Sequence, residues 1–335
     1  MNEVLYKDIY DFKNLLESYE ECIKSISVKK RYRRQVVAFS VNVEENIIEL
    51  QNDLIWKSYE MGDYSKFCVY EPKKRDIAAP TFRDRVLQTA LCRLLEPYIE
   101  RQFIYDSYAC RKGKGTLKAA RRAAYFTEKN KSGYYCKCDI HKFFFSININ
   151  ILLCLFRRYV KDADVMWLIE KILRKDCNGK GLKIGNRLSQ LSANVYLHEL
   201  DFYVKQNLHI KHYVRYADDF IFWGKKKSEL ERELGKIRSF LSTIELKENP
   251  EKTRIEECKK GLDFVGYMIY PNKVIILKRC IVKTKRLLRQ WKKGEISNVA
   301  FVASIASRCG HAKGTVSYKF YNDILLKALM FVVNN

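Results

Sequence analysis

Two adjacent aspartates, Asp218 and Asp219, stand between two runs of β-prone residues, 213–216 and 220–222. Adjacent aspartates are poor strand formers, so this pattern predicts the tight turn of a hairpin. Two carboxylates at a turn form an anionic site that a hard cation can neutralise, and Mg²⁺ prefers oxygen ligands. Taken alone, such a pair is more often a solvated turn.

A third aspartate makes a cation site the better interpretation than a solvated turn. Asp139 ends an apolar strand predicted over residues 134–140, where its carboxylate could converge with that of Asp218. Nucleotidyl transfer requires two metal ions about 4 Å apart, one activating the attacking 3′-hydroxyl and one holding the triphosphate. Three carboxylates from two strand ends meet that requirement.

Helical and extended segments alternate around these aspartates, which predicts an α+β fold. The clearest helix is expected over residues 83–98, with its apolar positions directed inward. These positions are Val86, Leu87, Ala90, Leu91 and Leu94. Further helices are expected over residues 5–16, 43–51, 117–125 and 188–204, and an extended segment over residues 66–80.

The chain of 335 residues carries a formal net charge of +24, and the excess is uneven. Residues 271–335 contain 13 basic and 2 acidic side chains, so this end is the strongest candidate for a polyanion-facing surface. A generally basic, solvated surface is the alternative. Eleven cysteines without paired spacing are typical of reduced thiols. With no secretory signal and no apolar run near the roughly 20 residues of a membrane span, we expect a cytoplasmic protein without a membrane partner.

Two of these motifs carry a family resemblance. Tyr216-Ala217-Asp218-Asp219 resembles the YxDD box of reverse transcriptases, and Asp139 followed by Phe144-Phe145-Ser146 resembles their first palm motif. The resemblance implies a right-hand polymerase fold with an N-terminal helical segment over residues 1–65, fingers and palm over 66–268 and a small basic helical thumb over 269–335. It also implies two Mg²⁺ ions, with Mn²⁺ as an alternative, bound by Asp139, Ile140, Asp218 and Asp219.

The same resemblance assigns further site residues. Lys252, in Asn249-Pro250-Glu251-Lys252-Thr253, matches the lysine proposed to protonate departing pyrophosphate. Phe144 falls at the aromatic steric gate that excludes a ribose 2′-hydroxyl, so deoxynucleotides should be preferred. The finger motifs place the incoming triphosphate against Lys73, Lys74 and Arg75. The primer grip is expected at Phe264, Val265, Gly266 and Tyr267.

The basic end of the chain predicts a thumb helix that follows the template-primer backbone. Leu287, Leu288 and Trp291 should give this helix an apolar face against the palm. The predicted nucleic-acid contacts are Lys283, Lys285, Arg286, Arg289, Lys292 and Lys293.

The motif in residues 182–190 indicates which group of reverse transcriptases the chain resembles. Most reverse transcriptases have a glutamine before the glycine and a proline after the serine of this motif, whereas here Ile184 precedes Gly185 and Gln190 follows Ser189. The pattern resembles the enzymes of diversity-generating retroelements, which copy a template-repeat RNA into cDNA with frequent errors opposite adenine, for mutagenic retrohoming. An aliphatic side chain cannot hydrogen-bond the nucleotide as an amide does, so discrimination against mispairs should weaken.

The partners implied are template RNA, the cDNA or primer strand, deoxynucleotides and a basic accessory protein that assembles as a pentamer, in a bacterial or phage-encoded system. A retron or phage-defence reverse transcriptase would use the same chemistry. A catalytically idle RNA-binding protein would also be basic, although the intact carboxylate triad argues against it. The identity of the template, the priming mode and the target gene stay open.

Overall fold

The computed structural model describes residues 4–70, 74–175, 177 and 179–333 of the chain. The chain forms two compact units that alternate along the sequence. The first comprises Met1–Tyr105, Ile140–Tyr203 and Ser239–Glu248, and the second comprises Asp106–Asp139, Val204–Arg238 and Asn249–Asn335. No described helix has the length and apolar character needed to cross a membrane.

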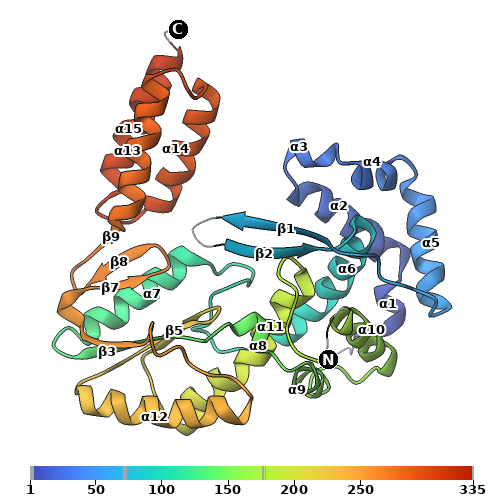
Figure 1. Cartoon of the computed structure of the whole chain (residues 1–335), viewed down its shortest axis with the longest axis horizontal. Helices are drawn as coiled ribbons and strands as arrows, with labels where there is room; N and C mark the ends of the chain where they lie inside the picture. The colour runs from blue at the N-terminus through green and yellow to red at the C-terminus, as the bar shows by residue number, and fades with distance from the viewer. Residues whose placement is uncertain (1–3, 71–73, 176, 178, 334–335) are drawn as a thin grey trace. The chain divides into compact units, whose positions relative to one another are not determined.

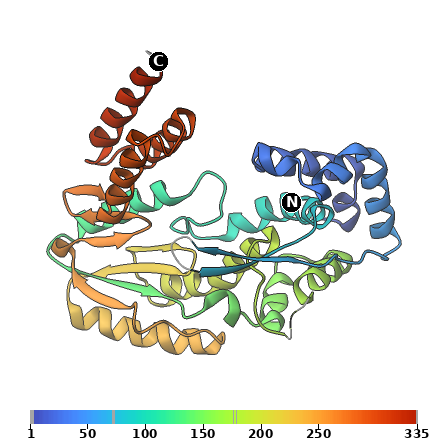
Figure 2. The same ribbon diagram turned by 45° about the horizontal axis from the view of Figure 1, so that its top comes forward.

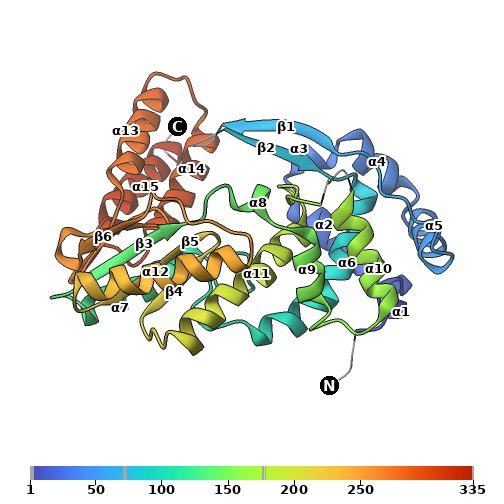
Figure 3. The same cartoon turned by 60° about the horizontal axis from the view of Figure 1, so that its bottom comes forward.

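The first unit is mainly helical, with one antiparallel hairpin made by β1 (Ser65–Tyr70) and β2 (Lys74–Ala79) (Figure 3). Its central helix is α6 (Phe82–Ile99), which packs against α2 (Phe12–Ser25) and α11 (Arg187–Phe202). The other helices are α1 (Tyr6–Ile9), α3 (Val28–Arg31), α4 (Arg34–Val41), α5 (Val43–Ile55), η1 (Glu100–Gln102), α8 (Phe143–Ser146), α9 (Ile149–Phe156) and α10 (Ala163–Arg174).

Local hydrogen bonds fix where α6 begins. The Thr81 side chain accepts from the backbone N–H of Asp84 and caps the helix. The buried Asp84 carboxylate in turn accepts from the hydroxyls of Thr81 and Tyr59, both at 2.6 Å, and from the N–H of Gly62 at 3.1 Å. This network holds the end of β2 and the start of α6 together.

The second unit contains two small antiparallel sheets together with helices. The four-stranded sheet has the order β4-β5-β3-β6, and the three-stranded sheet has the order β7-β8-β9. Figures 1 and 3 show α7 (Thr116–Lys129) on one face of the larger sheet and the start of α12 (Lys227–Thr243) along the other. The strands are β3 (Tyr134–Asp139), β4 (Tyr213–Tyr216), β5 (Asp219–Gly224), β6 (Arg254–Glu257), β7 (Leu262–Phe264), β8 (Tyr267–Tyr270) and β9 (Lys273–Ile276), and the short helical turns are η2 (Tyr203–Asn207) and η3 (Cys258–Lys260).

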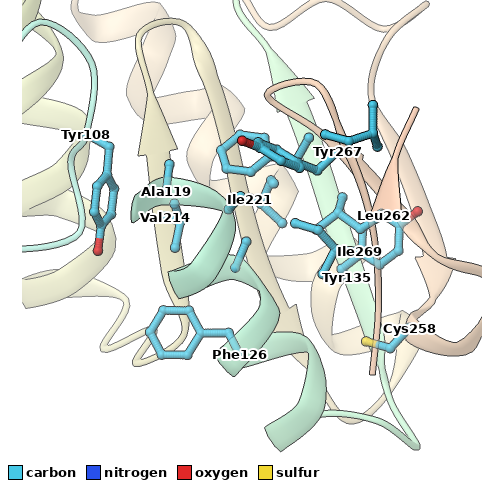
Figure 4. Close-up of a cluster of buried hydrophobic side chains, with 14 of the residues drawn as sticks. Tyr108, Ala119, Phe126, Tyr135, Val214, Ile221, Cys258, Leu262, Tyr267 and Ile269 are labelled. Carbon is cyan, nitrogen blue, oxygen red and sulfur yellow. The ribbon is translucent and has the colours of Figure 1, made fainter. Parts of the chain in front are cut away.

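The core of the second unit lies between α7 and both sheets (Figure 4). Ala119 and Phe126 of α7 pack with Tyr135 of β3 and Ile221 of β5, and Tyr267 of β8 joins the same cluster. The strands that carry the aspartates are therefore backed by a continuous apolar layer, which restricts their movement.

Three helices follow the small sheet at the C-terminal end, shown together in Figure 2. They are α13 (Lys278–Lys292), α14 (Asn298–Ala312) and α15 (Tyr318–Val333). Leu287, Leu288 and Trp291 of α13 pack on Phe301 and the neighbouring apolar residues of α14 and α15. The prediction that this apolar face lies against the palm was therefore wrong, because the thumb has a core of its own.

Two details of the predicted helices also differ. The segment 5–16 is two helices, because the Asp11 side chain accepts from the N–H of Asn14 and starts α2 after a break. In α6, Leu94 is only half-buried and Leu95 is fully buried. The strand over residues 134–140, the acidic hairpin and the helices near residues 43–51, 83–98, 117–125 and 188–204 are confirmed within a few residues.

Candidate active site

The two strands that carry the acidic residues are direct neighbours. In the antiparallel ladder of β3 and β5, Asp139 lies opposite Asp219. Tyr216 of β4 also pairs with Asp219, so Ala217 and Asp218 form a two-residue turn. Side chains of directly opposed residues in such a ladder lie about 5 Å apart. The fold thus gathers the three aspartates that the sequence predicted at one end of the sheet.

Ala217 adopts a backbone φ of 54° in this turn. That left-handed conformation suits glycine, asparagine or aspartate, and an alanine there costs about 1–2 kcal/mol. The turn is therefore strained at the residue directly before Asp218 and needs support from its surroundings.

A loop from the next segment reaches Asp139. The N–H of Asn249 donates to the Asp139 carbonyl at 2.7 Å, and the Asn249 side-chain amide lies 3.4 Å from Asp139 Oδ2. The Lys252 ammonium forms an ion pair with the same carboxylate, and its side chain is about 44% exposed. The lysine predicted to act as an acid is therefore within contact of one predicted metal ligand and open to solvent.

Burial raises the pKa of Asp219 to about 6. The ammonium of Lys137 opposes that rise, the carboxylates of Asp218 and Asp139 add to it, and Lys252 opposes it. A bound cation would therefore stabilise the ionised form of this carboxylate more than that of an exposed one, because it would offset both the cost of burial and the repulsion between like charges.

The donor set suits Mg²⁺, which binds through few carboxylates and keeps waters for substrate phosphates. Among the described residues, no three His, Cys, Asp or Glu side chains lie close enough together to hold a metal ion, so the carboxylates do not form a metal site by themselves in this structure. Ile140 follows Asp139 and forms an isolated β-bridge with Glu248; being apolar, it could bind a metal only through its carbonyl.

The predicted nucleotide-binding residues of the first unit gather on neighbouring segments. Lys74 and Arg75 are exposed at the start of β2, while Lys73 lies outside the described residues. At the other end of β2, the Ala78 N–H donates to the Ile184 carbonyl at 2.9 Å. Gly185 (φ 113°) sits so close to β2 that a Cβ would lie 2.8 Å from Ile77.

Ile184 lines a cavity of about 390 Å³ in this unit. The walls are mostly apolar, with Phe67, Phe145 and Leu182, and three lysines stand at its border, Lys66, Lys180 and Lys183. The Phe144 carbonyl accepts from the Leu182 N–H at 2.7 Å, which joins the predicted steric gate to the segment that carries Ile184. Phe144 is half-buried between the buried Phe143 and the exposed Phe145, and Gln190 is exposed on α11.

The predicted primer grip is the hairpin of β7 and β8. Phe264 and Tyr267 are fully buried, whereas the turn residues Val265 and Gly266 are partly exposed. The Tyr267 hydroxyl donates to the His311 carbonyl at 2.7 Å and lies 3.0 Å from Nδ1 of that ring. Only the turn of this motif is therefore placed to touch a nucleic acid.

All six predicted thumb contacts are exposed. Lys283, Lys285, Arg286, Arg289 and Lys292 project from α13 and Lys293 caps it, which leaves one strongly basic helix surface. Three residues with contacts at or near the site were not predicted as site residues from the sequence. The Lys137 ammonium donates to the Asp263 carbonyl beside the predicted primer grip, and the Asn249 amide contacts Asp139. The third residue, Arg215, donates to the Ala217 carbonyl. The signal for Arg215 was a charged residue inside an otherwise apolar strand.

This combination of an antiparallel sheet and three aspartates at one end of it agrees with the family comparison. A profile described as reverse transcriptase (RNA-dependent DNA polymerase) matches residues 70–269, more than half of the chain. The chain therefore belongs to the reverse transcriptase family.

Individual relatives are distant. The chain is 25% identical to Protein YkfC of Escherichia coli (strain K12) over 249 residues, which cover 60% of this chain and 65% of YkfC. It is 31% identical to the Group II intron-encoded protein LtrA of Lactococcus lactis subsp. cremoris over 145 residues, which cover 40% of this chain and 23% of LtrA. The chain thus spans just under two thirds of YkfC and about a quarter of LtrA.

The polymerase fold is also supported by a solved structure. Telomerase from Candida albicans, in complex with a fragment of telomeric RNA, matches with a TM-score of 0.52 at 12% identity. The match covers 65% of this chain and 46% of the telomerase chain. At that identity the likeness concerns the fold alone.

Proposed function

We propose that this protein synthesises cDNA on an RNA template, with Asp139, Asp218 and Asp219 as the metal-binding carboxylates. The observation that carries the proposal is the ladder pairing of Asp139 with Asp219 beside the Asp218 turn, in a chain of the reverse transcriptase family. Two bound Mg²⁺ ions would supply activation of the primer 3′-hydroxyl and neutralisation of the triphosphate.

The remaining roles belong to this chain's own side chains. Lys252, which pairs with Asp139 and is half-exposed, would donate a proton to departing pyrophosphate. Phe144 would reject a ribose 2′-hydroxyl, and the exposed Lys74 and Arg75 would bind the triphosphate. The basic face of α13 would follow the template-primer backbone and make binding salt-dependent.

We further propose that the enzyme serves a diversity-generating retroelement, in concert with a basic pentameric accessory protein. The support is Ile184, which presents an aliphatic side chain in a largely apolar cavity where most of the family has a glutamine. Without the amide, the nucleotide loses a polar contact that distinguishes paired from mispaired geometry. One hydrogen bond contributes about 0.5–1.5 kcal/mol, enough to change misincorporation about two- to tenfold.

A second candidate is an intron-linked reverse transcriptase, favoured by the 31% identity to LtrA and by the 28% identity to Nuclear intron maturase 2 of Arabidopsis thaliana. The role of Ile184 distinguishes the two candidates, because an enzyme that copies its template faithfully would not need weaker selection against mispaired nucleotides.

The experiment is to sequence cDNA made by the wild type and by Ile184→Gln on a template containing all four bases. The glutamine variant should make fewer errors, with the largest decrease opposite adenine. Ile184→Leu is the matched control, because it keeps an aliphatic side chain and should keep the error spectrum. A wild type that already copies adenine faithfully with its own RNA and accessory protein would exclude the retroelement role and leave the polymerase proposal standing.

A further inference from the structure

Arg215 is the largest fully buried side chain of the described residues. A guanidinium keeps its charge at any physiological pH, and burying it is costly unless its donors are satisfied. Replacing buried charged groups with apolar residues of similar volume often stabilises a protein. A buried arginine in β4, two residues before the acidic turn, therefore calls for a specific role.

The guanidinium joins two segments of the second unit. Nη1 donates to the carbonyl oxygen of Ala217 at 3.1 Å, and Nη2 donates to the hydroxyl of the fully buried Ser107 at 3.2 Å. The backbone of Arg215 is held as well, because its N–H donates to the Asp106 carbonyl and its carbonyl accepts from the Tyr108 N–H. Hydrogen bonds therefore hold Arg215 at both its backbone and its guanidinium group.

The Ala217 carbonyl belongs to the peptide group that links Ala217 to Asp218. A hydrogen bond to this oxygen fixes the plane of that peptide, and with it the direction in which the Asp218 side chain leaves the backbone. Ala217 needs such a constraint, because its φ of 54° is one that alanine rarely adopts.

We propose that Arg215 is a positioning residue for the metal-binding turn, holding the Ala217–Asp218 peptide so that the Asp218 carboxylate faces the metal site. This inference rests on the proposed function of Asp218.

A lysine at this position would keep the charge but lose the planar fork that reaches two acceptors at once. The test is calorimetric titration of Mn²⁺ into the protein without nucleotide, together with thermal melting and steady-state primer extension. The variants are Arg215→Lys, Arg215→Met and Ser107→Ala. Arg122→Lys is the matched control, because Arg122 donates to the Asp106 side chain at 2.7 Å in the same unit.

Both Arg215 variants should bind Mn²⁺ about tenfold or more weakly and lose kcat with little change in KM for the nucleotide. Ser107→Ala, which removes only the brace, should show a smaller loss of about two- to fivefold, and Arg122→Lys should bind Mn²⁺ like the wild type. If Arg215→Lys and Ser107→Ala melt earlier but bind Mn²⁺ normally, Arg215 merely stabilises the fold and the proposal is overturned.

If the Arg215 variants do not fold, Ser107→Ala decides alone, and unchanged Mn²⁺ affinity in that variant overturns the proposal. Asp218→Asn is measured in parallel. If that substitution leaves Mn²⁺ affinity unchanged, the metal site itself is misassigned, which is a different failure from one confined to Arg215.

Discussion

The second unit contains two hairpin turns of the same length that are supported in opposite ways. The acidic turn, Ala217-Asp218, places its positive φ on an alanine and is held by a buried, permanently charged guanidinium. In the grip turn, Val265-Gly266, both residues have a positive φ, 44° at the valine and 95° at the glycine. Its support is an imidazole, His311, whose pKa is lowered by burial.

The difference follows from what each turn must present. The acidic turn has to offer the Asp218 carboxylate in one orientation, and its strained Ala217 is held by the hydrogen bond from Arg215. The grip turn offers backbone and a partly exposed valine. Gly266 adopts its positive φ without steric cost, whereas Val265, also at positive φ, does not. We expect the two turns to respond differently to substitution and to pH.

The largest effect should follow Asp219→Asn. Primer extension should fall by at least about a thousandfold, because the site loses a charged oxygen donor. Stability should nevertheless not fall. The folded pKa near 6 lies above the ordinary value of 3.8, so the contribution of Asp219 to stability is fully present below pH 3.8 and is lost as the pH rises through about 6.

In EDTA at pH 7.5 the asparagine variant should therefore be about 1–2 kcal/mol more stable than the wild type, after allowance for partial solvent screening. Urea unfolding measures this difference, which should shrink as the pH is lowered from 7.5 toward 4. Asp323→Asn, on the exposed surface of α15, is the control and should change neither activity nor stability. A destabilised Asp219→Asn would show that the carboxylate supports the fold.

A smaller effect is expected at the grip turn. Gly266→Ala should lower the free energy of unfolding by about 1–3 kcal/mol and raise KM for the primer-template, since the residue has φ 95° and its new Cβ would lie 3.2 Å from His311 Nε2. Gly113→Ala carries a similar backbone penalty (φ 73°) but meets no atom within 4 Å. Equal losses in the two variants, measured by urea unfolding, would mean that the His311 contact is unimportant.

These experiments also bear on what sequence could reveal. The acidic hairpin and the strand ending at Asp139 were predictable, because alternation and turn chemistry are local properties. The role of Arg215 was not, since a charged residue is normally expected at the surface and its burial depends on a partner, Ser107, that is 108 residues away in the chain.

The thumb shows the same limit. Periodicity correctly predicted an amphipathic helix with Leu287, Leu288 and Trp291 on one side. The spacing of apolar residues does not, however, indicate which element that side packs against. Trp291 stacks on Phe301 with ring centroids 4.3 Å apart, a contact between two helices that only the folded chain reveals. In the same way, the Asp11 cap that divides the first predicted helix competes with a periodicity that continues through it.

The smallest effect should be the pH response of His311. Burial lowers the pKa of this ring, so its neutral form is favoured in the fold and its stabilising contribution is present above the ordinary value near 6.5. That contribution is lost as pH falls below 6.5. The wild type should therefore lose stability relative to His311→Gln between pH 7.5 and pH 5. Parallel pH profiles for wild type and His311→Gln would contradict this account of the grip.

The most direct measurement is extension of a DNA primer on an RNA template with deoxynucleotides and Mg²⁺, comparing the wild type with Asp218→Asn. We expect the wild type to make cDNA and the variant to make none, while both bind the primed RNA with nearly equal affinity, because the substitution removes one metal ligand and leaves the basic surfaces intact. cDNA synthesis by the asparagine variant at a rate near that of the wild type would contradict the assignment of the active site.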